Sequence, residues 1–124
     1  APVVDLNHSV VNPNDRYTRI GERAISADPK VVTVVAGEYC DALKQAGVHC
    51  TLKHFPGLGR VTEDTHTESA DLATDVETLA ATDWVPFREL MPTSGIFTML
   101  AFVFRPGHLG SCAGRMEARR RPRH

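Results

Sequence analysis

The chain has 124 residues, which is the size of one ordinary domain with one modest hydrophobic core. Its composition, 42% hydrophobic and 23% charged residues, is typical of globular proteins and excludes disordered, collagen-like and membrane-embedded classes. The net charge is −1, but the charged residues are unevenly distributed along the chain. Residues 1–104 carry 8 Lys and Arg against 14 Asp and Glu, whereas residues 105–124 carry 6 Lys and Arg against 1 Asp or Glu.

The N-terminal sequence APVVDL is a short apolar run rich in β-branched residues, which predicts a buried parallel strand that ends at Asp5. No apolar run approaches the ~20 residues that cross a bilayer, so we expect no membrane span. The start also lacks the basic residues and long apolar stretch of a signal peptide. Because it lacks an initiator Met as well, we expect the chain to be an internal piece of a longer protein.

Residues 7–27 are crowded with Asn, Asp, Pro and Gly, which predicts a long loop. Asp28 and Pro29 form a helix start, with Asp28 as the N-cap. Gly47 is expected to end this helix, and the sequence VHCTLKHF that follows predicts a second strand. The residues at helical spacing, which we expect to face the core, are Val32, Val35, Ala36, Tyr39 and Leu43.

A further loop over residues 56–73 precedes a second helix, which Thr74 or Asp75 can cap and which Pro86 is expected to kink or split. The uncharged run GIFTMLAFVF predicts a third strand that is buried on both faces. The predicted order, β-α-β-α-β, is that of a parallel α/β fold with right-handed crossovers. The residues of the second helix predicted to face inward are Val76, Leu79, Ala80, Phe87 and Leu90.

The three cysteines, Cys40, Cys50 and Cys112, are odd in number and widely spaced, which fits neither a disulfide framework nor a CxxC motif. We therefore expect them to be small core residues or residues without a special role. This pattern favours a reducing compartment, and we predict a cytoplasmic protein on that basis.

Residues 105–124 show no apolar periodicity and end in an Arg-rich sequence. They are expected to be either a solvated basic tail or a segment that never belonged to the fold, as after truncation or a reading-frame error. A nucleic-acid partner is not expected, because such binding needs a basic face on a folded element with motif support.

The sequence KHFPGLGRVTEDTH contains residues from which an active site can be built. Lys53 and His54 lie at the predicted carboxyl end of the second strand, which is where the active sites of parallel α/β folds are found. Asp5 and Arg23 stand at or beyond strand ends and can reach the same rim. The four side chains are therefore candidates for one site.

Asp64 and His66 are two residues apart in a loop, so the carboxylate can hydrogen-bond an imidazole nitrogen, orient the ring and raise its basicity. Such an imidazole can donate a proton to a leaving group and later accept one from water, which suits hydrolysis. The alternatives are structural: a local turn contact for this pair, a satisfied core histidine for His54 and a solvated strand end for Lys53. A metal site is disfavoured by the spacing and the neighbouring lysine, and we expect no cofactor because GLG is too short for a dinucleotide-binding fingerprint.

The same sequence resembles the K-H-F-P-G-x-G-x-x-x-x-D-[ST]-H signature of glycoside hydrolase family 3, in particular its bacterial β-N-acetylglucosaminidase branch. The segments APVVDL, IGERAISADP, ALKQAGV and TDWVPFREL stand in the order and spacing of further motifs of that family, so the resemblance covers nearly all of residues 1–104. It implies a fragment of a TIM-type (β/α)8 barrel with parallel strands. It also implies a retaining hydrolase that removes terminal N-acetylglucosamine, as in peptidoglycan recycling.

The resemblance assigns the general acid/base to His66 and the carboxylate that orients it to Asp64. It assigns sugar binding to three donors, with a supporting residue at a strand end; these are Arg23, Lys53 and His54, supported by Asp5. Two positions depart from the family pattern, since Leu58 stands where many members carry His and Arg60 where a small residue is frequent.

The family's nucleophile is an Asp at the end of a later strand, whereas the only acidic residue after Glu89 is Glu117. Without that carboxylate the covalent glycosyl intermediate cannot form, so we expect the chain alone to be inactive. We therefore predict a partial hydrolase that carries the acid/base half of a site for glycans containing N-acetylglucosamine. The alternatives are a non-catalytic sugar-binding or interaction module and a non-functional truncated product. Exposed sheet edges in such a fragment would favour self-association.

Overall fold

The computed structural model of the chain describes five stretches of sequence, residues 1–10, 12–67, 69–93, 96–100 and 103–104. The basic tail predicted for residues 105–124 lies outside them. Among the described helices, none combines the length and the apolar character that a bilayer crossing requires.

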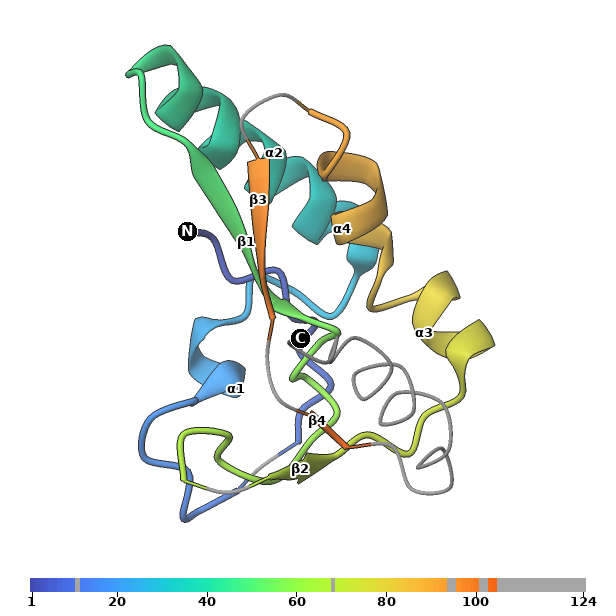
Figure 1. Cartoon of the computed structure of the whole chain (residues 1–124). Coiled ribbons are helices and arrows are strands. Elements are labelled where there is room, and N and C mark those ends of the chain that lie inside the picture. Colours follow the sequence, from blue (N-terminus) through green and yellow to red (C-terminus); the bar gives the residue numbers. More distant parts are fainter. Residues whose placement is uncertain (11, 68, 94–95, 101–102, 105–124) are drawn as a thin grey trace, which may run out of the picture.

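Two parallel strands and two helices form the centre of an α/β structure (Figure 1). Strand β1 (Cys50–Phe55) pairs with strand β3 (Ile96–Leu100), and helix α2 (Pro29–Gln45) packs against helix α4 (Val85–Leu90). The carboxyl ends of both strands point toward the lower half of Figure 1, where the loops gather. The remaining elements are short: α1 (Ile20–Arg23), β2 (Ala70–Asp71), α3 (Val76–Ala81) and β4 (Val103–Phe104).

The strand predicted for residues 1–6 is reduced to a single parallel bridge between Val3 and Lys53. The Val4 N–H donates to the Lys53 carbonyl at 2.8 Å, so the run lies alongside β1 in the expected direction. The ladder stops there because the side chain of Asp5, instead of a backbone carbonyl, accepts the N–H of His54 at 3.0 Å. The prediction of a regular strand is therefore wrong, although the run is placed beside β1.

Helix α2 begins where its capping residues predict. The Asp28 side chain accepts from the Lys30 N–H at 2.8 Å, and Pro29 occupies the first turn, where no N–H is needed. The helix ends at Gln45, and Gly47 follows with a φ of 77°, a conformation that favours glycine.

The buried face of α2 is rotated from the predicted one. The buried residues are Val32, Ala36 and Cys40, at spacings of four, whereas Val35 and Tyr39 are exposed. Hydrophobic spacing alone allowed either stripe, and contact with β1 decides between them.

The second predicted helix is split into α3 and α4, as the position of Pro86 predicts. Asp75 caps α3 by accepting from the Thr78 N–H at 2.7 Å, and Pro86 lies in the first turn of α4. Leu79 and Phe87 are buried as expected, whereas Val76 is exposed. The two predicted loops, residues 7–27 and 56–73, each contain a short element that the sequence did not predict. These elements are α1 and β2, respectively.

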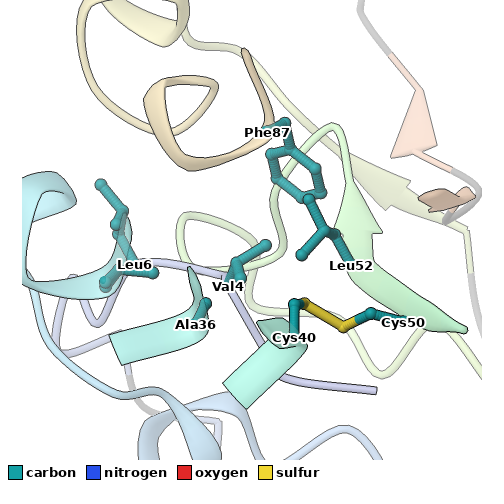
Figure 2. Close-up of a cluster of buried hydrophobic side chains, with 8 residues drawn as sticks. Val4, Leu6, Ala36, Cys40, Cys50, Leu52 and Phe87 are labelled. Atoms are coloured by element: carbon teal, nitrogen blue, oxygen red, sulfur yellow. A yellow bond between two sulfur atoms is a disulfide. The ribbon is translucent and has the colours of Figure 1, made fainter. Parts of the chain in front are cut away.

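One hydrophobic cluster lies between α2, α4 and β1 (Figure 2). A second cluster lies beneath the loops at the carboxyl end of β1 and includes Leu58, Val61 and Leu79. The buried members of the first cluster are Val4, Leu6, Val32, Ala36, Cys40, Cys50, Leu52 and Phe87.

Strand β3 has one covered face and one open face in the described structure. Ile96 packs against the first cluster, whereas Phe97 and Met99, which lie on the opposite face, are 57% and 46% exposed. The prediction that this strand is buried on both faces is therefore wrong for the described residues. The imidazole of His49 stacks edge-on against Phe97, with ring centroids 5.4 Å apart.

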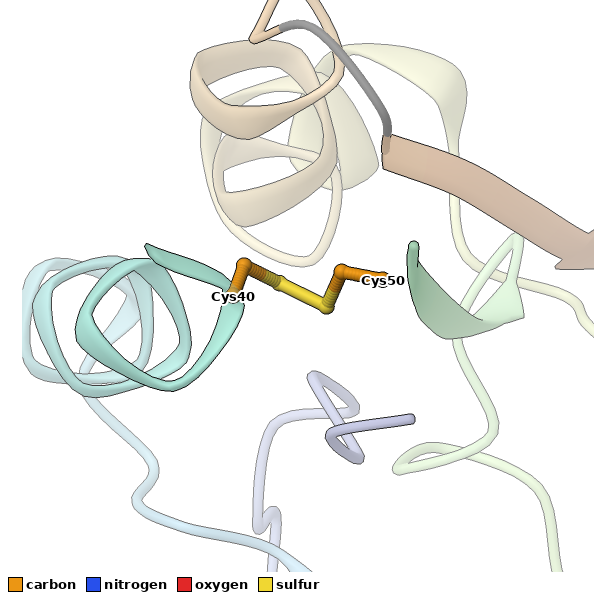
Figure 3. The surroundings of a disulfide bond; sticks show 2 residues. All are labelled: Cys40 and Cys50. Carbon is orange, nitrogen blue, oxygen red and sulfur yellow. A yellow bond between two sulfur atoms is a disulfide. The ribbon is translucent and has the colours of Figure 1, made fainter. Parts of the chain in front are cut away.

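Cys40 and Cys50 form a disulfide, which contradicts the prediction that the cysteines are unpaired (Figure 3). Their positions differ by 10 in the sequence. The turn after α2 reverses the chain, so that the start of β1 lies alongside the helix and the two Cα atoms are 5.3 Å apart. Disulfides are typical of oxidising compartments, so the cysteine pattern no longer supports a cytoplasmic location, which remains only a proposal.

Reduction of this disulfide is expected to lower the free energy of unfolding by about 2–3 kcal/mol, because a short closed loop restricts the unfolded chain. The measurement is urea unfolding with and without reductant. The matched control is the double variant Cys40→Ala/Cys50→Ala, whose stability should not respond to reductant. Equal stability of the parent chain under both conditions would contradict the pairing.

Candidate active site

The candidate residues gather at the carboxyl end of β1, where the loops after residue 6 and after Phe55 meet (Figure 1). This is the rim at which parallel α/β folds place their active sites. Carboxylates hold the two imidazoles, with Asp5 at His54 and Asp64 at His66, and the Thr18 carbonyl accepts from Arg23.

Asp5 lies beneath His54 and is almost completely buried. One carboxylate oxygen accepts from the His54 N–H and lies 2.8 Å from its Nδ1, and the other accepts from the Leu58 N–H at 2.6 Å. This contact places the proton of the neutral ring on Nδ1 and leaves Nε2 for a ligand. Asp5 therefore orients His54 and holds the following turn, while its supporting role in sugar binding stays a prediction.

Asp64 and His66 are in contact in the 61–67 loop. One Asp64 oxygen lies 3.1 Å from His66 Nδ1 and also accepts from the His66 N–H at 3.1 Å. Asp64 is buried, but the His66 side chain is 56% exposed. The imidazole is thus tethered at one nitrogen while the rest of its ring faces outward.

The Asp64 carboxylate receives further donors from residues 16–18. The N–H groups of Arg16 and Tyr17 donate to its second oxygen at 3.2 and 3.1 Å, and the Thr18 hydroxyl donates to the first at 2.8 Å. Burial alone would raise the pKa of Asp64, but the hydrogen bonds from Thr18, His66 and Tyr17 outweigh it, so that the pKa lies well below its ordinary value. Asp64 therefore stays ionised through the neutral range.

Arg23 is linked to this pair through Thr18. Its guanidinium donates to the Thr18 carbonyl at 2.7 Å, and the same residue's hydroxyl reaches Asp64. Lys53 lies in β1, half-buried, between the parallel neighbours Val3 and Met99. Within the described residues, hydrogen bonds join His54 to Asp5, and Arg23 to Thr18, whose hydroxyl contacts Asp64, but none joins these two groups.

The two departures from the family pattern have structural partners. Leu58 is buried in the second hydrophobic cluster, where an apolar side chain fits. Arg60 donates from Nε to Asp83 at 2.8 Å, and His8 Nε2 lies 2.9 Å from the other oxygen of that carboxylate. Burial would raise the pKa of Asp83, but the hydrogen bonds from Arg60, Thr82 and His8 hold it below its ordinary value. This ion cluster fastens the loop after β1 to the junction between α3 and α4.

A cavity of about 380 Å³ opens beside the site, between the loop of residues 7–22 and that of residues 58–63. Thr18 and Glu63 are among its lining residues, but the predicted catalytic and sugar-binding side chains are not. In the described part of the chain, no group of three His, Cys, Asp or Glu side chains is arranged to hold a metal ion.

Sequence reasoning missed three residues that the structure brings to the site: Tyr17, Thr18 and His8. The Tyr17 and His66 ring centroids are 5.8 Å apart. All three lie in a segment that the sequence marks only as polar loop, and no motif there distinguishes them. Their contacts span 48 to 75 residues of sequence, so only the fold reveals them.

The sequence profile described as Glycosyl hydrolase family 3 N terminal domain matches residues 1–118. The chain belongs to this family. The profile match extends past residue 104, where we placed the end of the resemblance. The described structure also ends at residue 104, so the predicted domain boundary at that residue stays a prediction.

Relatives and solved structures of glycosyl hydrolase family 3 agree with this assignment. A protein named Beta-hexosaminidase from Xylella fastidiosa (strain M12) is 43% identical over 117 residues, which are 92% of this chain and 32% of the relative. A family 3 β-N-acetylglucosaminidase from Paenibacillus sp. str. FPU-7 matches with a TM-score of 0.76 at 32% identity, covering 86% of this chain and 19% of that chain. NagZ from Neisseria gonorrhoeae, solved with N-trifluoroacetyl-D-glucosamine, matches with a TM-score of 0.75 at 29% identity, covering 86% and 29% of the two chains.

These structures confirm the predicted fold class. The chain is an α/β fragment with parallel strands that corresponds to part of a TIM-type barrel domain of glycosyl hydrolase family 3. It spans about a third of the length of the Xylella relative.

Replacement of the buried carboxylate by Asp64→Asn is expected to reduce stability most at neutral pH. The folded-state pKa lies below the unfolded value of about 3.9, so Asp64 contributes stability that is fully present above that value and is lost as the pH falls through the folded pKa. In urea unfolding at a series of pH values, the gap in unfolding free energy between the parent chain and Asp64→Asn should be constant above about pH 5 and should narrow below about pH 4. A gap that stays the same down to the acid end of the series would contradict this account.

Proposed function

We propose that this chain carries the acid/base half of a β-N-acetylglucosaminidase site that acts on glycans with terminal N-acetylglucosamine, such as peptidoglycan fragments in recycling. The observation that carries the proposal is the contact of buried, ionised Asp64 with the exposed imidazole of His66 at the carboxyl rim of the sheet. The names of the relatives and the sugar analogue bound to the gonococcal NagZ support the substrate class.

His66 is the proposed proton carrier. Asp64 accepts the Nδ1–H, so the exposed Nε2 is the nitrogen that exchanges protons with the substrate. In the first step the imidazolium gives its Nε2 proton to the glycosidic oxygen while the bond from that oxygen to the anomeric carbon breaks and the carboxylate nucleophile that a retaining mechanism requires bonds to that carbon. In the second step the neutral Nε2 takes a proton from the water that attacks the anomeric carbon and displaces this carboxylate.

Asp64 stabilises the charged form of the ring without itself taking a proton. Its carboxylate is buried and is held ionised by donors from two loops, so a fixed negative charge lies beside Nδ1 when the imidazolium forms. The exposed, loop-borne position of His66 allows the ring to approach the substrate for the first step and make room for water in the second.

Arg23, Lys53 and His54 are the proposed sugar-binding donors. Guanidinium and ammonium groups donate several hydrogen bonds to hydroxyls, and the Asp5 contact turns the Nε2 of His54 toward a ligand. Asp5 is buried beneath His54, so it is proposed to orient that ring and not to touch the sugar.

The nucleophile of a retaining mechanism must be a carboxylate, and the sequence contains no Asp or Glu from residue 90 to residue 116. We therefore expect no turnover of a chromogenic N-acetylglucosaminide by the 124-residue chain. The assay is release of the chromophore over hours at high protein concentration, with His66→Ala as the comparison. Hydrolysis by the parent chain that disappears in His66→Ala would contradict the expectation and show that a nucleophile is present.

The second candidate function is a non-catalytic sugar-binding module, which sugar binding without turnover in a well-folded monomer would favour. In calorimetry with N-acetylglucosamine, Lys53→Ala is expected to weaken binding about 10-fold or more, because a hydrogen bond from a charged group is lost. Lys44→Ala is the matched control, since Lys44 is an exposed lysine in the last turn of α2, which leads into the amino end of β1, opposite the rim. Equal weakening by both variants would remove Lys53 from the site.

Self-association through the open face of β3 is a further proposal about partners. Phe97 and Met99 present exposed apolar surface on this face, and among the described residues β3 pairs along one edge only, with β1. Phe97→Lys is expected to shift the chain toward the monomer in light scattering after size-exclusion chromatography. A parent chain that is monomeric at high concentration would contradict this proposal.

A further inference from the structure

The backbone around Thr18 is held by contacts within its own turn, apart from the contacts that the residue makes with the site. It is almost completely buried, and the turn that carries it is closed by Asp15. The Asp15 carboxylate accepts from the Thr18 N–H and from the Arg19 N–H, both at 2.8 Å. Asp15 therefore fixes the backbone from which the Thr18 side chain extends.

The Thr18 hydroxyl lies between the two members of the acid/base pair. Its Oγ1 is 2.8 Å from an Asp64 oxygen and 3.4 Å from His66 Nδ1, and the same Asp64 oxygen is 3.1 Å from that Nδ1. A hydroxyl has one hydrogen and two lone pairs. When the hydrogen is donated to the ionised carboxylate, a lone pair of Oγ1 faces the imidazole nitrogen, which then has two acceptors in front of it.

Only one tautomer of the neutral His66 ring satisfies this arrangement. With the proton on Nδ1, the N–H points between the carboxylate oxygen and the hydroxyl oxygen. With the proton on Nε2, the lone pair of Nδ1 would face the negative Asp64 oxygen, and the hydroxyl would have to abandon the carboxylate to donate to the ring. Because a buried carboxylate that loses a donor is costly, the second arrangement is disfavoured.

The backbone of Thr18 reaches the other half of the site. Its carbonyl accepts from the Arg23 guanidinium at 2.7 Å. One residue thus holds the proposed acid/base pair through its side chain and a proposed sugar-binding arginine through its main chain.

We propose that Thr18 is a positioning residue that forms a triad with Asp64 and His66 and keeps the neutral His66 ring in the Nδ1–H form, so that Nε2 is the reactive nitrogen. The proposal deepens the proposed function and rests on it. Thr18 does not touch the substrate and acts through the carboxylate and the ring.

The test is ring ¹⁵N NMR of His66 in the 124-residue chain, at a pH where the ring is neutral. The parent chain is expected to show mainly the Nδ1–H form. Thr18→Val, which keeps the shape and removes the hydroxyl, should lower the ratio of Nδ1–H to Nε2–H about fivefold or more, the effect of one lost hydrogen bond. Thr18→Ser, which keeps a hydroxyl, should restore the ratio.

The matched control is Thr33→Val, which makes the same substitution on α2, where the hydroxyl donates to the Pro29 carbonyl. It should leave the His66 ratio unchanged. A parent chain with mainly the Nε2–H form would overturn the proposal without any variant. A ratio that is equal in Thr18→Val and the parent, or that falls equally in Thr33→Val, would also overturn it.

These outcomes are separate from those that test the proposed function. A change of tautomer in Thr18→Val without any binding of N-acetylglucosamine supports the triad and counts against the sugar site. Binding of the sugar with an unchanged tautomer supports the site and counts against the triad.

Discussion

Buried carboxylates hold this rim together, because a charge removed from water must be compensated by hydrogen-bond donors. Asp5, Asp64 and Asp83 are each almost completely buried, and each collects its donors from segments that are distant in sequence. Asp5 joins residues 1–6 to the turn after β1. Asp64 joins the loop of residues 15–18 to its own loop. Asp83 joins Arg60, in the loop after β1, and His8, in the loop after residue 6, to the junction between α3 and α4. The loops therefore take their shape from three acceptors more than from regular secondary structure.

Two of these carboxylates hold imidazoles by the same nitrogen but in different environments. His54 is 13% exposed and His66 is 56% exposed, while each has its Nδ1 next to an aspartate oxygen. An enclosed histidine such as His54 is suited to present one fixed nitrogen to a ligand. A histidine tethered at Nδ1 and open elsewhere is suited to move and to exchange a proton, which is the difference that the proposed roles require.

An ion pair near one end of β1 and a disulfide at the other reinforce the structure around this strand. Arg60 gains a buried partner in Asp83, which in turn contacts His8, so a large cation in the loop strengthens its attachment to the helices. The Cys40–Cys50 bond fastens the end of α2 to the start of β1, on the opposite end of the strand from the site (Figure 3). Both features tie the central strand to the helices that cover one of its faces.

The sequence by itself determined where α2 begins and ends and where the second predicted helix divides. The start of α2 at Asp28, its stop near Gly47 and the division of the second helix near Pro86 depend on capping and on backbone restrictions that act within a few residues. The KHFPGLGRVTEDTH segment likewise indicated the family and the Asp64–His66 contact, because its residues are neighbours in the chain.

Only the tertiary structure decided which stripe of α2 is buried, that Asp5 replaces part of a strand ladder, that two cysteines pair, and that Thr18 completes the contact around Asp64. Each of these depends on groups brought together by the closing of loops over β1, and the side-chain contacts of Asp5 and Thr18 span 46 to 53 residues. Local propensity cannot encode such contacts, since the same polar loop sequence is compatible with many loop conformations until buried acceptors select one.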